Sequence, residues 1–179
     1  MNGTKPLKTK RLVLRRHTLQ DAEILYERFG KDPLMYRYSG WNPYRTLEQA
    51  KKSVKEYNER YKDTTFYGWA IQYKDRLIGT IGAYDYDPVQ SQIEIGLSIE
   101  RALWNNGFGL EALVSVLKYL TENEKIQTVT AWCVPENIGS QKIMETAGMH
   151  MVQRKNRSLE IDGMWYDQMF FEYTDNRKK

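Results

Sequence analysis

A glycine-rich segment has the residue types and spacing of a phosphate-binding loop. Residues 104–112 contain Gly107 and Gly109, and they separate a predicted strand over residues 91–99 from a predicted helix over residues 110–121. Glycine lets a backbone approach a ligand closely, and the free N–H groups of a first helical turn point at an anion. We therefore expect the backbone of five successive residues to bind a pyrophosphate group: Asn106, Gly107, Phe108, Gly109 and Leu110.

The glycine pattern by itself is not specific. It lacks the Lys-Ser/Thr ending of a P-loop and the third glycine of a dinucleotide-binding fingerprint. A strand-to-helix turn without a ligand is the plain alternative. Glu111, in the first turn of the predicted helix, is expected to favour the helix dipole and to cap backbone groups rather than act as a base.

The strand before the loop carries a candidate catalytic carboxylate. Its residues Gln92, Glu94, Gly96 and Ser98 alternate with isoleucine and leucine, so one face is polar and the other apolar. Glu94 lies on the polar face, which leads toward the glycine loop, and it is our candidate general base. The alternative is an exposed carboxylate on a half-solvated strand.

A second segment, residues 135–149, contains an Asn-x-x-Ser pattern at Asn137 and Ser140 and ends in Gly148 and Met149. The two residues lie three positions apart, so they share one side of a predicted helix. Together with the glycine loop, this segment resembles the GCN5-related N-acetyltransferases (GNAT). Within that superfamily it resembles the RimJ/RimL-type branch, which modifies protein N-termini and various small amines.

The resemblance extends from about Thr9 to Glu172 and includes the strand at residues 78–82 and the turn at residues 161–163. It implies an α/β (α+β) fold: a mixed, largely antiparallel sheet of about seven strands, with helices on both faces and splayed central strands. Hydrophobic periodicity predicts the matching order β-α-α-β-β-β-α-β-α-β-β. We expect a single domain over residues 1–179, with a core at about 9–173 and a basic tail at 174–179.

The resemblance also assigns site residues. Acetyl-CoA is the implied acetyl donor, and backbone N–H groups of one strand segment are expected to hold its pantetheine arm and polarise the thioester: Leu97, Ser98 and Ile99. Asn137 is expected to bind the pantetheine arm, and Ser140 to act as general acid or to stabilise the leaving thiolate. Plain helix capping by Asn137 and Ser140 is the alternative, and both roles are compatible.

Two positions depart from the family pattern. Trp104 stands where the family usually has Gln or Arg before the first glycine, which weakens the match more than the expected backbone binding. Met144 stands where most of the wider family has a proton-donating Tyr. The RimJ/RimL branch shares this second departure, and there the Ser of Asn-x-x-Ser is the implied donor.

An aromatic loop at residues 32–45 is the candidate acceptor wall, through Tyr36, Tyr38 and Trp41, together with Glu94. Aromatic residues on a loop are typical of binding sites. In the resembling family, this region helps to shape the acceptor pocket. A lid over the core is the alternative.

Composition excludes several classes. Charged residues make up 28% of the 179-residue chain, apolar residues 41%, and the net charge is +4. No apolar run is long enough to cross a membrane, and no signal sequence begins the chain. A single Cys133, expected to be buried and inert, fits a cytoplasmic location. Isolated His17 and His150 predict no metal site. The sequence has no stripe of basic residues, so nucleic-acid binding is not expected.

The sequence leaves three functions open. The first is an acetyl-CoA-dependent N-acetyltransferase that acts by direct attack of a protein or peptide α-amine. The second changes the acceptor to a small amine such as a polyamine, amino acid or antibiotic. The third is an acyl-CoA-binding sensor without turnover. Deprotonating an α-amine at pH 7 costs roughly 1 kcal/mol, against roughly 4–5 kcal/mol for a lysine-like amine. Monomer and homodimer both remain open.

Overall fold

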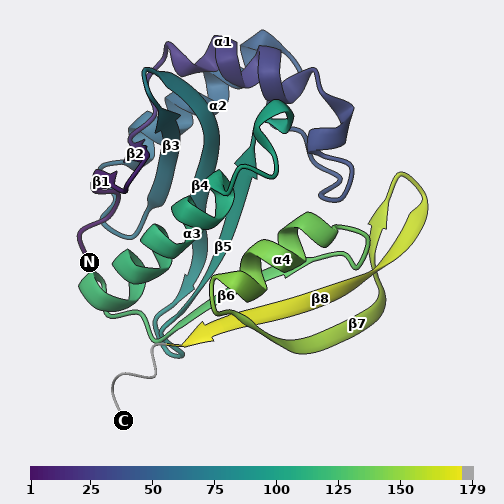
Figure 1. The fold of residues 1–179 in the computed structure, drawn as a ribbon. Helices are drawn as coiled ribbons and strands as arrows, with labels where there is room; N and C mark the ends of the chain where they lie inside the picture. Colours follow the sequence, from purple (N-terminus) through teal and green to yellow (C-terminus); the bar gives the residue numbers. More distant parts are fainter. Residues whose placement is uncertain (175–179) are drawn as a thin grey trace.

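The computed structural model describes residues 1–174, so most of the expected basic tail lies outside the described residues. Eight strands form one open sheet in the order β1-β2-β3-β4-β5-β6-β8-β7 (Figure 1). The strands are β1 (Leu7–Lys8), β2 (Leu12–Arg15), β3 (Tyr67–Tyr73), β4 (Arg76–Asp87), β5 (Gln92–Ile99), β6 (Thr128–Cys133), β7 (His150–Ile161) and β8 (Met164–Thr174). Within residues 1–174, only β5 and β6 pair in parallel, which confirms the mixed, largely antiparallel sheet.

Within the described residues, four α-helices cover the sheet (Figure 1). They are α1 (Asp21–Leu25), α2 (Leu47–Arg60), α3 (Phe108–Lys118) and α4 (Ile138–Thr146). Residues of α3 and α4 share an apolar cluster with Trp69 and Ile81. Residues of α1 and α2 share another with Ala70 and Leu77. Because neighbouring strand residues point to opposite faces, the two helix pairs lie on opposite faces of the sheet.

The packed structure begins earlier than the predicted core. The expected first strand is β2, and the short strand β1 pairs beside it, so the sheet has eight strands rather than about seven. Thr4 is buried, and its hydroxyl donates to the carbonyl of Phe66 at 3.0 Å. The N–H of Asn2 donates to Glu124 at 2.8 Å. These partners are remote in sequence, so local periodicity carried no sign of them.

Three element boundaries also differ from the predictions. Helix α3 begins at Phe108 rather than residue 110, because Gly107 adopts the left-handed conformation (φ 77°) and ends the loop. The sequence predicts a loop over residues 85–90, but strand β4 continues to Asp87 through a bulge at Asp85 (φ 56°). The sequence predicts a strand over residues 149–155, but strand β7 continues to Ile161. It is exposed along nearly its whole length, so it lacks the buried alternation by which strands are predicted.

The sequence predicts a helix that is capped by Thr46 and ends at about Lys62, and helix α2 agrees closely with this prediction. It begins after Thr46, whose hydroxyl accepts the backbone N–H of Gln49 at 3.1 Å, while the side chain of Gln49 accepts the N–H of Thr46 at 3.2 Å. This capping box is a local signal that the sequence displays directly. Within residues 1–174, none of the helices has the length and apolar character needed to span a bilayer.

Candidate active site

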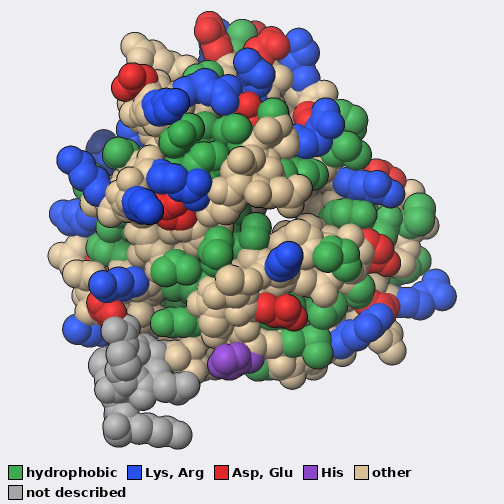
Figure 2. All heavy atoms as spheres, in the orientation of Figure 1, with side chains coloured by type: hydrophobic (Ala, Val, Ile, Leu, Met, Phe, Trp, Pro, Cys, Tyr) green, Lys and Arg blue, Asp and Glu red, His purple; other side chains and the backbone are tan. Residues whose placement is uncertain are grey.

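The central strands separate, as predicted. Strands β5 and β6 pair at three positions, of which the last joins Glu94 to Thr130. Beyond it, residues 95–99 of β5 have no partner in β6, although they remain paired with β4. Figure 2 shows a hollow between the part of the molecule that contains β5 and the part that contains α4 and the β7–β8 hairpin.

Backbone groups of β5 face this gap at alternate residues. The N–H of Glu100 donates to Ile78 of β4, and the carbonyl of Ile99 accepts the indole N–H of Trp104 at 2.7 Å. Because N–H and C=O directions alternate along a strand, the backbone groups of Leu97 point toward the gap and those of Ser98 toward β4. Of the three predicted residues, Leu97 and Ile99 therefore direct their backbone groups toward the gap, and the carbonyl of Ile99 is already used by Trp104.

The predicted anion-binding loop has an open helix terminus. In the described chain, no side chain caps α3, whose N-cap residue is Gly107. The N–H of Glu111 donates to the carbonyl of Gly107. The first-turn N–H groups of Phe108, Gly109 and Leu110 therefore have no acceptor within the helix. This terminus carries partial positive charge and fits a pyrophosphate. The side chain of Phe108 itself is buried, against Tyr73.

Gly109 joins the loop, the strand and α4. A Cβ atom at this position would lie 3.1 Å from the side chain of Ile143 on α4 and 3.4 Å from that of Leu97 on β5. Glycine therefore permits three separate segments to meet. This contact brings the start of α3 beside α4, which carries Ser140 one turn before Ile143.

Gly109→Val is expected to lower the free energy of unfolding by about 1–3 kcal/mol, because the larger side chain must displace Ile143 or Leu97. Urea unfolding measures the change. The control is Gly139→Ala on α4, where a new Cβ atom would have its nearest neighbour at 3.9 Å. Alanine there should raise stability by about 0.5–1 kcal/mol. Equal effects of the two substitutions would contradict the packing argument.

Arg11 supports the loop and was not predicted. Its Nη1 donates to the carbonyl of Asn106 at 3.0 Å, its Nε to Glu111 at 2.7 Å, and its guanidinium lies 4.3 Å from the centre of the Phe108 ring. Glu111 therefore caps a backbone N–H group, as expected, but this group belongs to Arg11 and not to α3. It accepts from the backbone and side chain of Arg11 and from Thr9. These contacts span about a hundred positions, so spacing along the sequence could not reveal them.

Helix α4 presents both residues of the Asn-x-x-Ser pattern. The side-chain oxygen of Asn137 accepts the backbone N–H of Ser140 at 3.2 Å, so Asn137 is the N-cap of α4. The hydroxyl of Ser140 makes no hydrogen bond to any described residue, and its side chain is half-buried. The capping alternative is thus correct for Asn137, while the hydroxyl of Ser140 is left available.

Glu94 lies at the start of the gap. Its carboxylate accepts the indole N–H of Trp132 at 3.1 Å and hydrogen-bonds to Tyr84. Burial raises the pKa of Glu94 above its usual value, and these two hydrogen bonds oppose the rise. Tyr84 and Trp132 were not predicted as site residues, since an aromatic residue in a strand is more often a core residue.

The candidate residues divide between the two faces of the sheet. Glu94 alternates with Ile93 and Ile95, which are buried on the α3 side, so its side chain lies on the α1–α2 side. The helix terminus at Gly107 and the residue Ser140 belong to the α3–α4 side. The gap between β5 and β6 connects the two sides.

The aromatic loop reaches the β7–β8 hairpin. The ring of Tyr38 packs edge-on against that of Tyr166, with 6.4 Å between the ring centres. The hydroxyl of Tyr36 is buried and has no hydrogen-bond partner in the described chain. Trp41 is 71% exposed, so it is not part of a core lid. The structure thus places Tyr36 and Tyr38 in packed positions and Trp41 at the surface.

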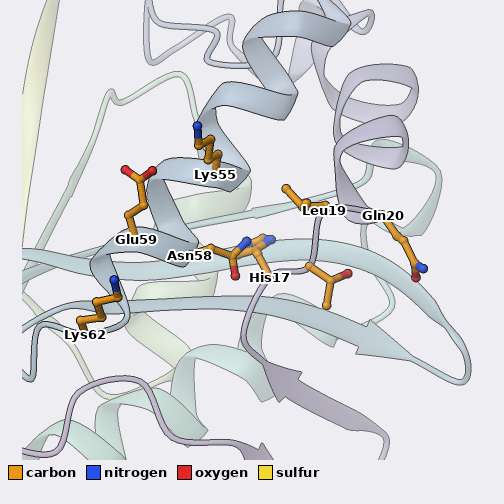
Figure 3. A pocket seen from close by; sticks show the side chains of 8 residues that line it. His17, Leu19, Gln20, Lys55, Asn58, Glu59 and Lys62 are labelled. Carbon is orange, nitrogen blue, oxygen red and sulfur yellow. The ribbon is translucent and has the colours of Figure 1, made fainter.

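A separate hollow of about 650 Å³ lies between α2 and the segment joining β2 to α1 (Figure 3). The side chains of Lys55, Asn58 and Glu59 approach it from α2, and that of His17 from the joining segment. Desolvation lowers the pKa of the buried His17 to about 4. None of the predicted site residues lines this hollow.

The chain is similar to known acetyltransferases in sequence and in structure. A family model described as acetyltransferase (GNAT) domain matches residues 11–150. An uncharacterized N-acetyltransferase, YoaA of Bacillus subtilis (strain 168), is 29% identical over 163 residues, which cover 90% of this chain and 92% of YoaA.

Two solved structures share the fold. RimL, a ribosomal L7/L12 alpha-N-protein acetyltransferase in complex with coenzyme A, has a TM-score of 0.87 and 14% identity, covering 95% of this chain and 98% of RimL. MccE, a microcin C7 self-immunity acetyltransferase in complex with acetyl-CoA and AMP, has a TM-score of 0.83 and 15% identity, covering 93% and 94%.

Proposed function

Because the chain belongs to the GNAT acetyltransferase family, we propose that it transfers the acetyl group of acetyl-CoA to the α-amine of a protein or peptide by direct attack. The observation that carries this proposal is the gap between β5 and β6. Candidate donor-binding groups lie on its α3–α4 side, and a carboxylate lies at its start on the other side. Two substrates that approach from opposite faces would meet there.

Acetyl-CoA would supply the activated acetyl thioester. The uncapped N–H groups at the start of α3 would bind its pyrophosphate, and Asn137 would contact the pantetheine arm. The backbone N–H of Leu97 would donate to the acetyl oxygen, a contribution of about 3–4 kcal/mol for one such donor. Asn137 would use its amide nitrogen for its contact with the pantetheine arm, because its side-chain oxygen accepts the N–H of Ser140.

Two side chains would move protons. The amine nitrogen attacks the carbonyl carbon, a C–N bond forms and the C–S bond breaks. Glu94 would accept the proton that the amine loses, directly or through a water molecule. Ser140 would give a proton to the leaving sulfur, which the free state of its hydroxyl permits. The Ser140 proton is replaced from solvent.

The charges around Glu94 support an α-amine over a polycation. Asp87 accepts the N–H groups of Val89 and Gln90 at 2.8 and 3.1 Å, so its carboxylate is held in its own turn. Asp85 is the acidic neighbour that acts on Glu94. A polyamine would be bound better by several carboxylates. An α-amine also needs the smaller deprotonation energy. RimL, which shares the fold, is an α-N-protein acetyltransferase.

Coenzyme A release tests the proposal. Purified protein and acetyl-CoA are incubated with short peptides of varied N-terminal residue, the same peptides with blocked N-termini, polyamines, amino acids and aminoglycosides. We expect thiol release with free peptides and none with blocked ones. Thiol release with small amines only would contradict the α-amine proposal and favour a small-molecule acceptor. Tight acetyl-CoA binding without release for any acceptor would favour a sensor.

A further inference from the structure

An indole from β6 reaches back to β5 where the two strands part. Glu94 and Thr130 form the last paired position. Trp132 follows Thr130 by two residues, so it lies on the same face of the sheet but beyond the paired region. Its Nε1 nevertheless donates to Oε1 of Glu94 at 3.1 Å. This hydrogen bond spans the start of the gap.

A phenol from β4 approaches the same carboxylate from the other side. Tyr84 is the cross-strand partner of Glu94 and hydrogen-bonds to it. A Cβ atom at Gly96, two residues further along β5, would lie 2.9 Å from the hydroxyl oxygen of Tyr84. The absence of a side chain at Gly96 therefore makes room for this hydroxyl. Gly96 was expected only as part of the polar face of this strand, and the position of the Tyr84 hydroxyl explains why the residue there is glycine.

The two donors act on the charge of Glu94 in the same direction. A hydrogen bond to a carboxylate favours the ionised form, whereas burial favours the neutral form. Within residues 1–174, the titratable groups that act on Glu94 are Tyr84 and Asp85, both on β4. Tyr57 of α2 acts on Tyr84. Trp132 does not titrate, so its contribution is constant with pH.

We propose that Trp132 and Tyr84 are positioning residues that hold the carboxylate of Glu94, from β6 and from β4, at the mouth of the gap. The inference rests on the proposed acetyl transfer, in which Glu94 accepts the proton of the amine. A carboxylate held on two sides keeps its remaining lone pairs directed away from its two neighbours. It also stays ionised at lower pH than burial alone would allow.

The pH dependence of kcat/KM separates this role from packing alone. With a peptide acceptor, kcat/KM should fall toward acid pH in two steps, one from the amine and a lower one from Glu94. Trp132→Phe and Tyr84→Phe each remove one donor and keep a ring. Each should move the lower step upward by about one pH unit, the size of one charge-assisted hydrogen bond at a half-buried site.

Matched variants anchor the comparison. Glu94→Gln should abolish the lower step, and adding Trp132→Phe to it should cause no further shift. Trp165→Phe is the indole control: Trp165 lies on the β7–β8 hairpin and is 51% exposed. Its pH profile should match that of the unaltered protein. Tyr84→Phe keeps the test open if Trp132→Phe fails to fold.

A second readout needs no turnover. Protein labelled with ¹³C at the glutamate carboxyl carbons is titrated by NMR, and the Glu94 signal is identified by its loss in Glu94→Gln. The Glu94 transition should move upward in Trp132→Phe and Tyr84→Phe. Unchanged transitions in both variants would overturn the positioning role. If no acceptor is acetylated, the proposed function fails, and the NMR titration still decides whether the two residues hold the carboxylate.

Discussion

Glu124→Ala is expected to lower the free energy of unfolding by about 2–4 kcal/mol, since it removes the acceptor of several buried donors. The carboxylate of Glu124 accepts the hydroxyls of Tyr67 and Tyr119, each at 2.8 Å, and both donors of Asn2. Tyr119 also lies 2.7 Å from the carbonyl of Gly3 and keeps that acceptor. Tyr67, which is 1% exposed, is left without one.

Glu124→Gln separates the charge from the side-chain volume. Glutamine keeps one acceptor oxygen, so the expected loss is smaller, about 1–2 kcal/mol. The control is Glu56→Ala on α2, where the carboxylate is exposed and its ion pair with Lys52 is 3.9 Å long. That substitution should change stability by less than about 0.5 kcal/mol. Urea unfolding at pH 7 measures all three variants.

The difference in the free energy of unfolding between the unaltered protein and Glu124→Gln should depend on pH. Burial would raise the pKa of Glu124, but hydrogen bonds from Asn2, Tyr119 and Tyr67 lower it below its usual value. A carboxylate with a lowered folded pKa contributes stability at neutral pH, and the contribution disappears as pH falls through that pKa. The two unfolding energies should therefore begin to converge as the pH falls below the ordinary glutamate pKa of about 4.3. A constant difference down to pH 3 would contradict the assignment.

His17 adds an acid sensitivity that both proteins share. Its folded pKa of about 4 lies below the usual 6.5, because burial disfavours the charged imidazole. The unfolded chain takes up this proton first, so stability falls as pH drops from about 6.5 to about 4. Because His17 is present in every variant, its contribution cancels in the comparison that isolates Glu124.

Features that depend on neighbouring residues could be predicted from the sequence. The capping box at Thr46 and Gln49, the glycine turn before α3 and the alternation of β5 each lie within a few positions. These patterns give the element order, and the order and spacing of motifs give the family. The separation of β5 from β6 was expected from the resemblance alone, since no local pattern encodes a strand that lacks a partner.

Features that depend on distant partners could not be predicted. Arg11 contacts Asn106, Trp132 contacts Glu94, and Asn2 contacts Glu124 across separations of 95, 38 and 122 residues. The same side chains fit ordinary surface or core positions when only their neighbours are known. The sequence therefore indicates which groups could do chemistry, while the groups that hold them emerge only from the packed chain.

Ser140→Ala is expected to reduce kcat by about 100- to 10,000-fold without loss of stability. The fold needs only the backbone N–H of Ser140, which Asn137 accepts, and alanine keeps that group. The proposed proton donation to the leaving sulfur needs the hydroxyl. The rate of acetyl transfer to the best peptide acceptor should therefore fall in this variant, while the free energy of unfolding measured in urea should stay the same.

Asn137→Ala is the matched comparison, because it removes the cap as well as the contact proposed for the pantetheine arm. It should lower the unfolding energy by about 1 kcal/mol and raise the KM for acetyl-CoA. A thioester with a more acidic thiol leaving group provides the decisive arm. Such a group leaves without a proton, so it should restore much of the rate of Ser140→Ala but not that of Glu94→Gln. If Ser140→Ala kept full kcat, the leaving sulfur would take its proton from solvent, and Ser140 would be a helix residue without a chemical role.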